Sequence, residues 1–77
     1  MEKQEESRLL TVLSDRELEV LRQVALGFTS REISEKLALS PKTVDTYRQR
    51  AMEKLGLSHR SDLIRFALRA GLLENDA

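Results

Sequence analysis

The stretch TSREISEKLALSPKTVDTYRQRAMEKL, residues 29–55, decides the fold of this chain. Thr29 and Glu32 have the spacing of a capping box, in which each side chain accepts a hydrogen bond from the other residue's backbone N–H, so a helix begins here. A second helix begins after Ser40, which is a favourable N-cap, and Pro41 suits its first position because no N–H donor is needed there. The stretch therefore predicts two helices joined by a tight turn.

The two predicted helices differ in length. The first is short and ends near Leu39, whereas the second runs over 41–55, where Gly56 supplies a left-handed stop. A short helix, a tight turn and a longer helix with a polar face form a helix-turn-helix over about 29–55, and the second helix of such a unit enters the major groove of DNA. The inward residues of the first helix are Ile33, Leu37 and Ala38, and those of the second are Val44, Ala51 and Leu55.

Two further helices are predicted around this unit. Ser14 and Glu17 form another capping box at the start of a helix over about 15–26, and the last helix spans roughly 60–70. Leu supplies 14 of the 77 residues, and Glu, Arg and Lys dominate the charged residues, which favours helix over strand. We therefore expect an all-α chain with a compact four-helix domain over 13–73. The inward stripe of the helix over 15–26 is Leu18, Leu21, Val24 and Ala25.

Length and composition exclude several classes of protein. The chain has no Cys and carries 13 basic and 13 acidic residues, so its formal net charge is zero. No apolar run exceeds three residues, which excludes a transmembrane span, and the polar first residues do not form a signal peptide. We therefore expect an intracellular, cytoplasmic protein. We interpret residues 1–12 as a flexible arm or linker and 74–77 as a loose tail.

The polar face of the helix over 41–55 is the first candidate functional surface. Its exposed positions recur at i, i+3, i+4 and i+7, so side chains that donate and accept hydrogen bonds line one face. Residues 41–60 hold five basic residues against two acidic ones, a local charge of +3 in a neutral chain. Such a patch fits the DNA backbone, and donors near Ser40 suit a phosphate. The face comprises Lys42, Asp45, Thr46, Gln49 and Glu53, bordered by Thr43, Arg50 and Lys54.

Four blocks of sequence make the interpretation more specific. They are LSDRELEVL (13–21), GFTSREIS (27–34), LSPKTV (39–44) and EKLGL (53–57), and together they resemble the LuxR/FixJ-type DNA-binding domain over about 13–73. The resemblance implies a four-helix domain of bacterial transcription regulators that binds DNA through its third helix and dimerises on inverted repeats through its fourth. Most such domains are the output end of a two-component response regulator or a signal-sensing protein, and a few are free-standing.

The resemblance also assigns residues to the DNA. We expect Thr46 and Gln49 to read base edges, and Lys42 and Thr43 to contact phosphates. Asp45 departs from the Lys that is common in the family; it would repel phosphates but could accept from a cytosine amino group. The two arginines of the helix either contact phosphates or pair with acidic neighbours at the surface. The full expected set is Ser40, Lys42, Thr43, Asp45, Thr46, Arg48, Gln49, Arg50 and Lys54.

The last predicted helix carries more apolar residues than one core-facing stripe needs. They are Leu63, Ile64, Phe66, Ala67, Leu68 and Ala70. One interpretation is deep packing between the first helix and the returning Leu72 and Leu73. The other, favoured by the resemblance, is a two-fold interface between two copies on DNA. The residues of that interface would be Ile64, Arg65, Leu68 and Arg69.

No arrangement of residues predicts an enzyme, a metal site or a cofactor. His59 has no Cys or second His at ligand spacing, and Glu17 and Glu32 each occupy the third position of a capping box. We expect no small-molecule ligand in this chain. The expected partners are double-stranded DNA, a second copy of the chain and, as a candidate, RNA polymerase. The alternative, supported by Asp45 and the zero net charge, is a helical protein-interaction module that keeps the fold without binding DNA.

Overall fold

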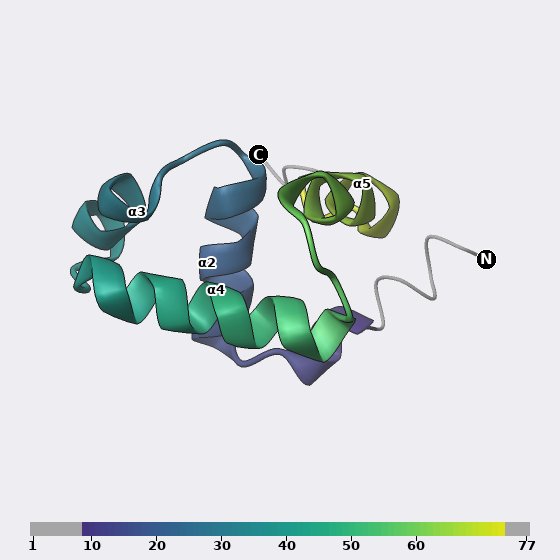
Figure 1. Cartoon of the computed structure of the whole chain (residues 1–77), viewed down its shortest axis with the longest axis horizontal. Coiled ribbons are helices and arrows are strands. Elements are labelled where there is room, and N and C mark those ends of the chain that lie inside the picture. Colours follow the sequence, from purple (N-terminus) through teal and green to yellow (C-terminus); the bar gives the residue numbers. More distant parts are fainter. Residues whose placement is uncertain (1–8, 74–77) are drawn as a thin grey trace.

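The computed structural model describes residues 9–73, and every regular element in this part is a helix (Figure 1). The all-α, four-helix fold expected from the sequence is confirmed, with a short 3-10 helix ahead of the four α-helices. Residues 1–8 of the expected arm and the expected tail over 74–77 lie outside the described residues. The elements are η1 (Leu10–Val12), α2 (Asp15–Ala25), α3 (Ser30–Leu37), α4 (Pro41–Leu55) and α5 (Arg60–Ala70).

Both predicted capping boxes are present and set the starts of α2 and α3. Ser14 Oγ accepts the Glu17 N–H at 3.1 Å, and the Glu17 carboxylate accepts the Ser14 N–H at 2.9 Å. Thr29 and Glu32 make the same pair of bonds, at 3.1 and 2.9 Å. Each box pairs backbone donors that a helix N-terminus would otherwise leave unpaired. Local sequence therefore determines where these two helices begin.

The turn between α3 and α4 differs from the expectation. α3 ends at Leu37 and not near Leu39, because Ala38 takes the left-handed conformation with φ 58° and ψ 43°. Ala38 is exposed, so its predicted inward position is wrong. Leu39 packs against the core in its place, since the left-handed residue reverses the chain and the Leu39 N–H bonds to the Ser34 carbonyl at 2.9 Å.

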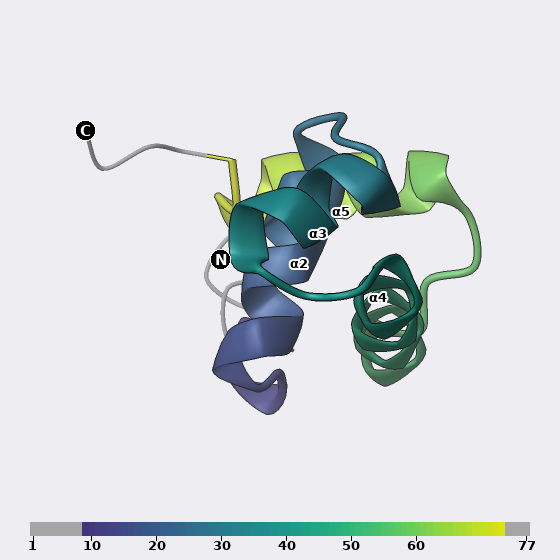
Figure 2. The same ribbon diagram turned by 90° about the vertical axis from the view of Figure 1, so that its left-hand side faces the viewer.

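The core lies where α4 crosses α2, with α3 and α5 at the sides (Figure 1, Figure 2). α2 has neighbours on several sides, so its buried stripe is wider than predicted and includes Val20. Leu18, which was expected in that stripe, is only partly buried. The buried positions expected on α4, Val44 and Ala51, are both fully enclosed. The side chains with 0 or 1% exposure are Val20, Leu21, Ile33, Val44, Ala51, Leu63 and Ala67.

α5 buries one stripe of apolar residues and leaves another outside. The buried stripe comprises Leu63, Phe66, Ala67 and Ala70. Ile64 and Leu68 are 36% and 63% exposed. Packing within the domain therefore accounts for only part of the apolar surface of this helix.

η1 lies within the stretch that was expected to be a flexible arm. The Leu13 N–H bonds to the Leu10 carbonyl at 3.2 Å and closes the turn. Leu10 packs against the core, whereas Leu9 and Val12 are 44% and 49% exposed. Regular structure therefore begins before residue 13, where the sequence placed the start of the domain.

Replacing Ala38 by Gly is expected to stabilise the fold. The left-handed conformation costs a residue with a Cβ about 1–2 kcal/mol, which Gly avoids, while the greater freedom of Gly in the unfolded chain offsets about 0.4–1 kcal/mol. The free energy of unfolding, measured with urea, should therefore rise by about 0.5–1 kcal/mol.

The matched control for this change is Gly56→Ala. Gly56 has a φ of 71°, and a Cβ added there would meet no atom within 4 Å, so only the backbone conformation opposes the substitution. Its free energy of unfolding should fall by about 1 kcal/mol. A fall in Ala38→Gly as well would show that the left-handed turn is not strained.

Candidate nucleic-acid interface

α4 presents its polar face to solvent. Lys42 and Gln49 are exposed, and within residues 9–73 their side chains have no hydrogen-bond or ion-pair partner. Thr46, between them, is half-buried and donates its hydroxyl hydrogen to the Lys42 carbonyl at 3.1 Å. The oxygen of that hydroxyl can still accept a hydrogen bond. This face therefore offers an uncommitted ammonium, an uncommitted amide and an acceptor hydroxyl.

The N-terminus of α4 offers a small group of donors. Pro41 has no N–H, and Ser40 Oγ accepts the Thr43 N–H at 3.1 Å, so the Lys42 N–H is the amide left for a ligand in the first three residues. The hydroxyl oxygens of Ser40 and Thr43 lie 2.8 Å apart, and one hydroxyl donates to the other. The hydrogen of the accepting hydroxyl remains available. An anion here would meet an amide, a hydroxyl and the Lys42 ammonium.

Asp45 is held by two neighbours. Its Oδ1 accepts a hydrogen bond from Ser30 Oγ at the start of α3 and lies 3.6 Å from Nη2 of Arg48. The guanidinium compensates the negative charge, so the repulsion expected between Asp45 and phosphates is reduced. Sequence reasoning missed the bond to Ser30, because the two residues lie 15 apart in different helices and no spacing rule connects them.

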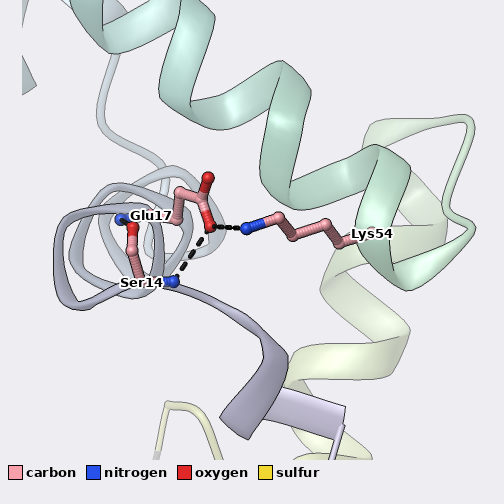
Figure 3. Close-up of polar contacts among 3 residues, drawn as sticks. All are labelled: Ser14, Glu17 and Lys54. Atoms are coloured by element: carbon pink, nitrogen blue, oxygen red, sulfur yellow. Dashed lines mark hydrogen bonds and ion pairs between the residues drawn. The ribbon is translucent and has the colours of Figure 1, made fainter.

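Lys54, expected to border the DNA-binding face, reaches back to α2 (Figure 3). Its Nζ lies 2.7 Å from Glu17 Oε1, which also accepts the Ser14 N–H. Glu17 is only 4% exposed. The Lys54 ammonium and the Ser14 N–H hold the pKa of Glu17 below its ordinary value of 4.5, although burial acts in the opposite direction. A phosphate contact by Lys54 would compete with this ion pair.

The sequence contains a signal for this ion pair in the position of Glu17 on α2. Glu17, Leu21 and Val24 occupy one stripe of α2 at i, i+4 and i+7, so a carboxylate falls on the face that the core covers. A buried carboxylate needs a cation or several hydrogen-bond donors. The identity of the cation was not accessible, because Lys54 lies 37 residues further along the chain.

Arg60 closes the other end of α2. Its Nη2 donates to the Val24 carbonyl at 3.3 Å, which also accepts the Gly27 N–H. A cation beside the last carbonyls of a helix is favoured by the helix dipole. From the sequence, Arg60 was predicted only to add to the basic excess of residues 41–60, and its contact with Val24 was not predicted.

The cations around α4 therefore fall into two groups. Arg48 and Lys54 have acidic partners in the free protein. Lys42 and Arg50 have none among the described residues, and both are exposed. The uncommitted positive charge of α4 thus lies on these two residues.

The outer stripe of α5 combines apolar and charged side chains. All four residues expected at a two-fold interface are exposed: Ile64, Arg65, Leu68 and Arg69. Arg65 pairs with Asp62 at 3.2 Å, and Arg69 also has an interaction partner. The structure brings these residues to one side of the helix, away from the core.

Two further findings concern the described residues alone. None of their helices is long and apolar enough to cross a membrane. No three of their His, Cys, Asp and Glu side chains come together in a way that could hold a metal ion. His59 is exposed before α5, and its backbone N–H donates to the Asp62 carboxylate at 3.2 Å.

A short helix, a tight turn and a longer helix with an exposed polar face define a helix-turn-helix domain of the DNA-binding class. The family model described as "Bacterial regulatory proteins, luxR family" matches residues 11–67. The chain therefore belongs to the LuxR family of bacterial regulatory proteins. It is a DNA-binding regulator domain and not an enzyme.

Individual relatives agree with this assignment. "Oxygen regulatory protein NreC" of Staphylococcus aureus strain JH9 is 46% identical over 63 residues, which cover 82% of this chain and 29% of NreC. NreC of strain JH1 gives the same figures. The crystal structure of full-length FixJ from B. japonicum matches with a TM-score of 0.84 and 32% identity, over 94% of this chain and 36% of that one. The chain thus spans about a third of the proteins it resembles, and the family assignment made from four sequence blocks is confirmed.

Glu17→Gln should weaken the fold and flatten its acid dependence. The folded-state pKa of Glu17 is lowered, so its carboxylate stabilises the fold at pH values above 4.5 and this stability is lost as the pH falls through the folded-state pKa. The variant lacks the carboxylate, so its free energy of unfolding should be about 1 kcal/mol lower at neutral pH and should fall less steeply in acid. Urea unfolding at a series of pH values measures both effects.

The matched control is Glu19→Gln on the same helix. Glu19 pairs with Arg16 at 3.3 Å, and both side chains are about half exposed, at 50% and 43%. Such surface pairs contribute little, so this variant should keep the stability and the acid dependence of the parent chain. Identical acid dependence in the Glu17 and Glu19 variants would contradict a special role for Glu17.

Proposed function

We propose that α4 lies in the major groove of double-stranded DNA and reads base edges with Thr46 and Gln49. The observation that carries this proposal is the outward face of α4, whose amide, ammonium and hydroxyl oxygen are available to a ligand. A helix about 10–12 Å across fits a groove about 12 Å wide. Membership of the LuxR family supports DNA as the partner over the alternative of a protein-interaction module.

The two reading residues suit different base edges. A Gln amide can pair in bidentate fashion with N6 and N7 of adenine, so we infer that Gln49 prefers adenine. The Thr46 hydroxyl has already donated its hydrogen, so it would accept from an amino group, while its methyl group can contact thymine. The second carboxylate oxygen of Asp45 could accept from a cytosine amino group.

We infer that phosphate contacts come first from the start of α4. Ser40, Lys42 and Thr43 combine an amide, a hydroxyl hydrogen and an ammonium there, and Arg50 adds an uncommitted guanidinium on the flank of the helix. The remaining two cations would have to share or release their acidic partners to contact DNA. These two are Arg48 and Lys54.

We propose that two copies bind an inverted repeat through α5. Ile64 and Leu68 are exposed apolar residues, and burying them against the same stripe of a second copy would remove them from water. Arg65 and Arg69 would lie at the rim. Few phosphate contacts make a single copy a weak binder, so pairing on two half-sites about one DNA turn apart would raise the affinity.

We also propose a larger setting for the domain. It spans 29% of NreC and 36% of FixJ, which fits the output domain of a two-component response regulator or a free-standing relative. Such a regulator would act in the cytoplasm, at the nucleoid when bound, with RNA polymerase as a candidate partner.

Gln49→Ala and Lys42→Ala should have separable effects on DNA binding. The Gln49 variant should lose about 1–3 kcal/mol of discrimination at one base pair, because a bidentate base contact is removed. The Lys42 variant should bind all sequences more weakly, and the slope of log K against log salt should decrease in magnitude by about 0.9. Selection from random duplexes followed by sequencing measures the first effect, and gel shifts in a salt series measure the second. A selected motif that is unchanged in the Gln49 variant would refute base reading by this residue.

Leu68→Glu should prevent paired binding without unfolding the domain. The side chain is 63% exposed in the single chain, so a charge there is solvated, but in the interface the carboxylate would lose its water and would replace the apolar contact made by Leu68. Sedimentation on a duplex with an inverted repeat should show two wild-type copies and one variant copy. Leu26→Glu is the control, because Leu26 is 46% exposed at the end of α2. One wild-type copy per inverted repeat would contradict the proposed interface.

A further inference from the structure

A cavity of about 320 Å³ lies beside α4, between α2, α3 and the start of α5. Phe28 and Met52 contribute apolar lining, and Arg48, Arg60 and Ser58 contribute polar lining. No carboxylate is among the lining residues that the structure describes. The cavity therefore has two guanidinium groups on a partly apolar wall, and Asp45, which pairs with Arg48 and bonds to Ser30, lies behind one of them.

The polar groups of the cavity keep donors for a ligand. A guanidinium has five N–H donors. Nη2 of Arg48 forms an ion pair with Asp45 at 3.6 Å, which is longer than a hydrogen bond, and Arg60 uses one donor on the Val24 carbonyl. The Ser58 hydroxyl is exposed and has no partner among residues 9–73. The chemistry that two guanidinium forks and a hydroxyl recognise is a phosphate.

A further cation adds to this positive surface. Lys36 Nζ lies 4.2 Å from the centre of the Phe28 ring, and that ring also lines the cavity. A cation over an aromatic face is held by the ring's electrostatic field. The cations near the cavity thus come from three helices: Lys36 from α3, Arg48 from α4 and Arg60 from the start of α5.

The cavity lies on a specific side of α4. Arg48 and Met52 line it, and Asp45 on the same flank bonds to Ser30 of α3, so this flank faces α3. A helix nearly fills the width of the major groove, so the two sugar-phosphate backbones pass along its two flanks. One backbone would therefore run past the mouth of the cavity when Thr46 and Gln49 face the bases.

We propose that this cavity binds one backbone phosphate of the DNA, with Arg48, Arg60 and Ser58 as donors and the apolar wall against the adjoining sugar. The proposal rests on the major-groove placement of α4. It adds the segment before α5 to the DNA-binding surface and gives Arg60 a second role besides closing α2. The site's volume is at the lower end of small-molecule pockets, which suits a single phosphate and its sugar.

The test uses Arg60→Gln and duplexes with one neutral methylphosphonate at each backbone position in turn. The variant should bind the natural duplex about three- to tenfold more weakly, because a charge-assisted contact at an exposed site is lost. Its salt slope should be smaller in magnitude by about 0.9. At one position the methylphosphonate should weaken wild-type binding but leave the variant unaffected, which identifies the phosphate by a double-mutant cycle.

Two controls separate this effect from loss of charge or of folding. Arg16→Gln removes a positive charge at the start of α2 and should keep the wild-type response to every methylphosphonate. Because Arg60 also bonds to Val24, its variant is compared with Ser58→Asp, which changes an exposed residue without any contact in the described chain. Ser58→Asp should weaken binding at least as much by repelling the phosphate, and Ser58→Asn should not. Thermal unfolding checks that each variant is folded.

The outcomes distinguish the two proposals. The cavity proposal alone would be overturned if the Arg60 and Ser58 variants kept the wild-type salt slope and showed no coupling to any methylphosphonate position, while base preference still depended on Gln49. Absence of DNA binding by the wild-type chain would overturn both. Free inorganic phosphate presents the same phosphate oxygens as the DNA backbone and could occupy the same cavity. In an NMR titration, millimolar phosphate could saturate the chemical-shift changes of the Ser58 and Arg60 amides. If adding the duplex then left these shifts unchanged, the cavity would bind free phosphate and the DNA proposal would be overturned.

Discussion

The carboxylate of Glu17 is the contact on which the placement of the reading helix depends. One oxygen accepts both the Ser14 N–H, at the start of α2, and the Lys54 ammonium, in the last turn of α4. Near its start, at the fifth residue, α4 is tied to α3 by the bond between Ser30 and Asp45. α4 is thus held at both ends by polar contacts and in the middle by apolar packing. Its rotation about its own axis, which decides which side chains face the DNA, is fixed by these three attachments.

The distribution of charge explains how a chain with zero net charge can bind a polyanion such as DNA. Two acidic residues pair with cations of the same domain: Glu17 of α2 with Lys54, and Asp45 of α4 with Arg48. They lower the number of cations free for DNA, but they also position side chains around the reading face. A surface with a few well-placed cations contacts few phosphates, so sequence-independent binding should be weak relative to base-dependent binding. Zero net charge is therefore compatible with sequence reading.

Local signals in the sequence predicted most of the fold. The capping pairs at Ser14 and Thr29 and the Ser-Pro start of α4 depend only on near neighbours, and the predicted bounds of α4, residues 41–55, are those of the structure. The wrong position of Ala38 arose because a helical period was extended into a left-handed turn, which no Gly or Asn marks.

The candidate site was less accessible to sequence reasoning for a physical reason. The residues of the polar face follow from the helical period of a single element. The contacts that decide whether a cation is paired or available, such as Lys54 with Glu17 and Arg60 with Val24, join residues that are more than 30 positions apart in sequence. Such pairs follow from how α2 packs against its neighbours, and a single sequence does not encode that packing as a spacing. The cavity beside α4 belongs to the same category, because four separate segments line it.

The left-handed Ala38 makes the helix-turn-helix unit stiff before it meets DNA. Alanine samples far fewer backbone conformations than glycine, so few orientations of α3 relative to α4 are open to the chain. A binding unit that is already ordered loses less conformational entropy when it binds, and more of its contact energy appears as affinity. Ala38, which strains the turn, thus preorganises α3 and α4 for binding. This gain in affinity matters most for a domain that makes few contacts with DNA.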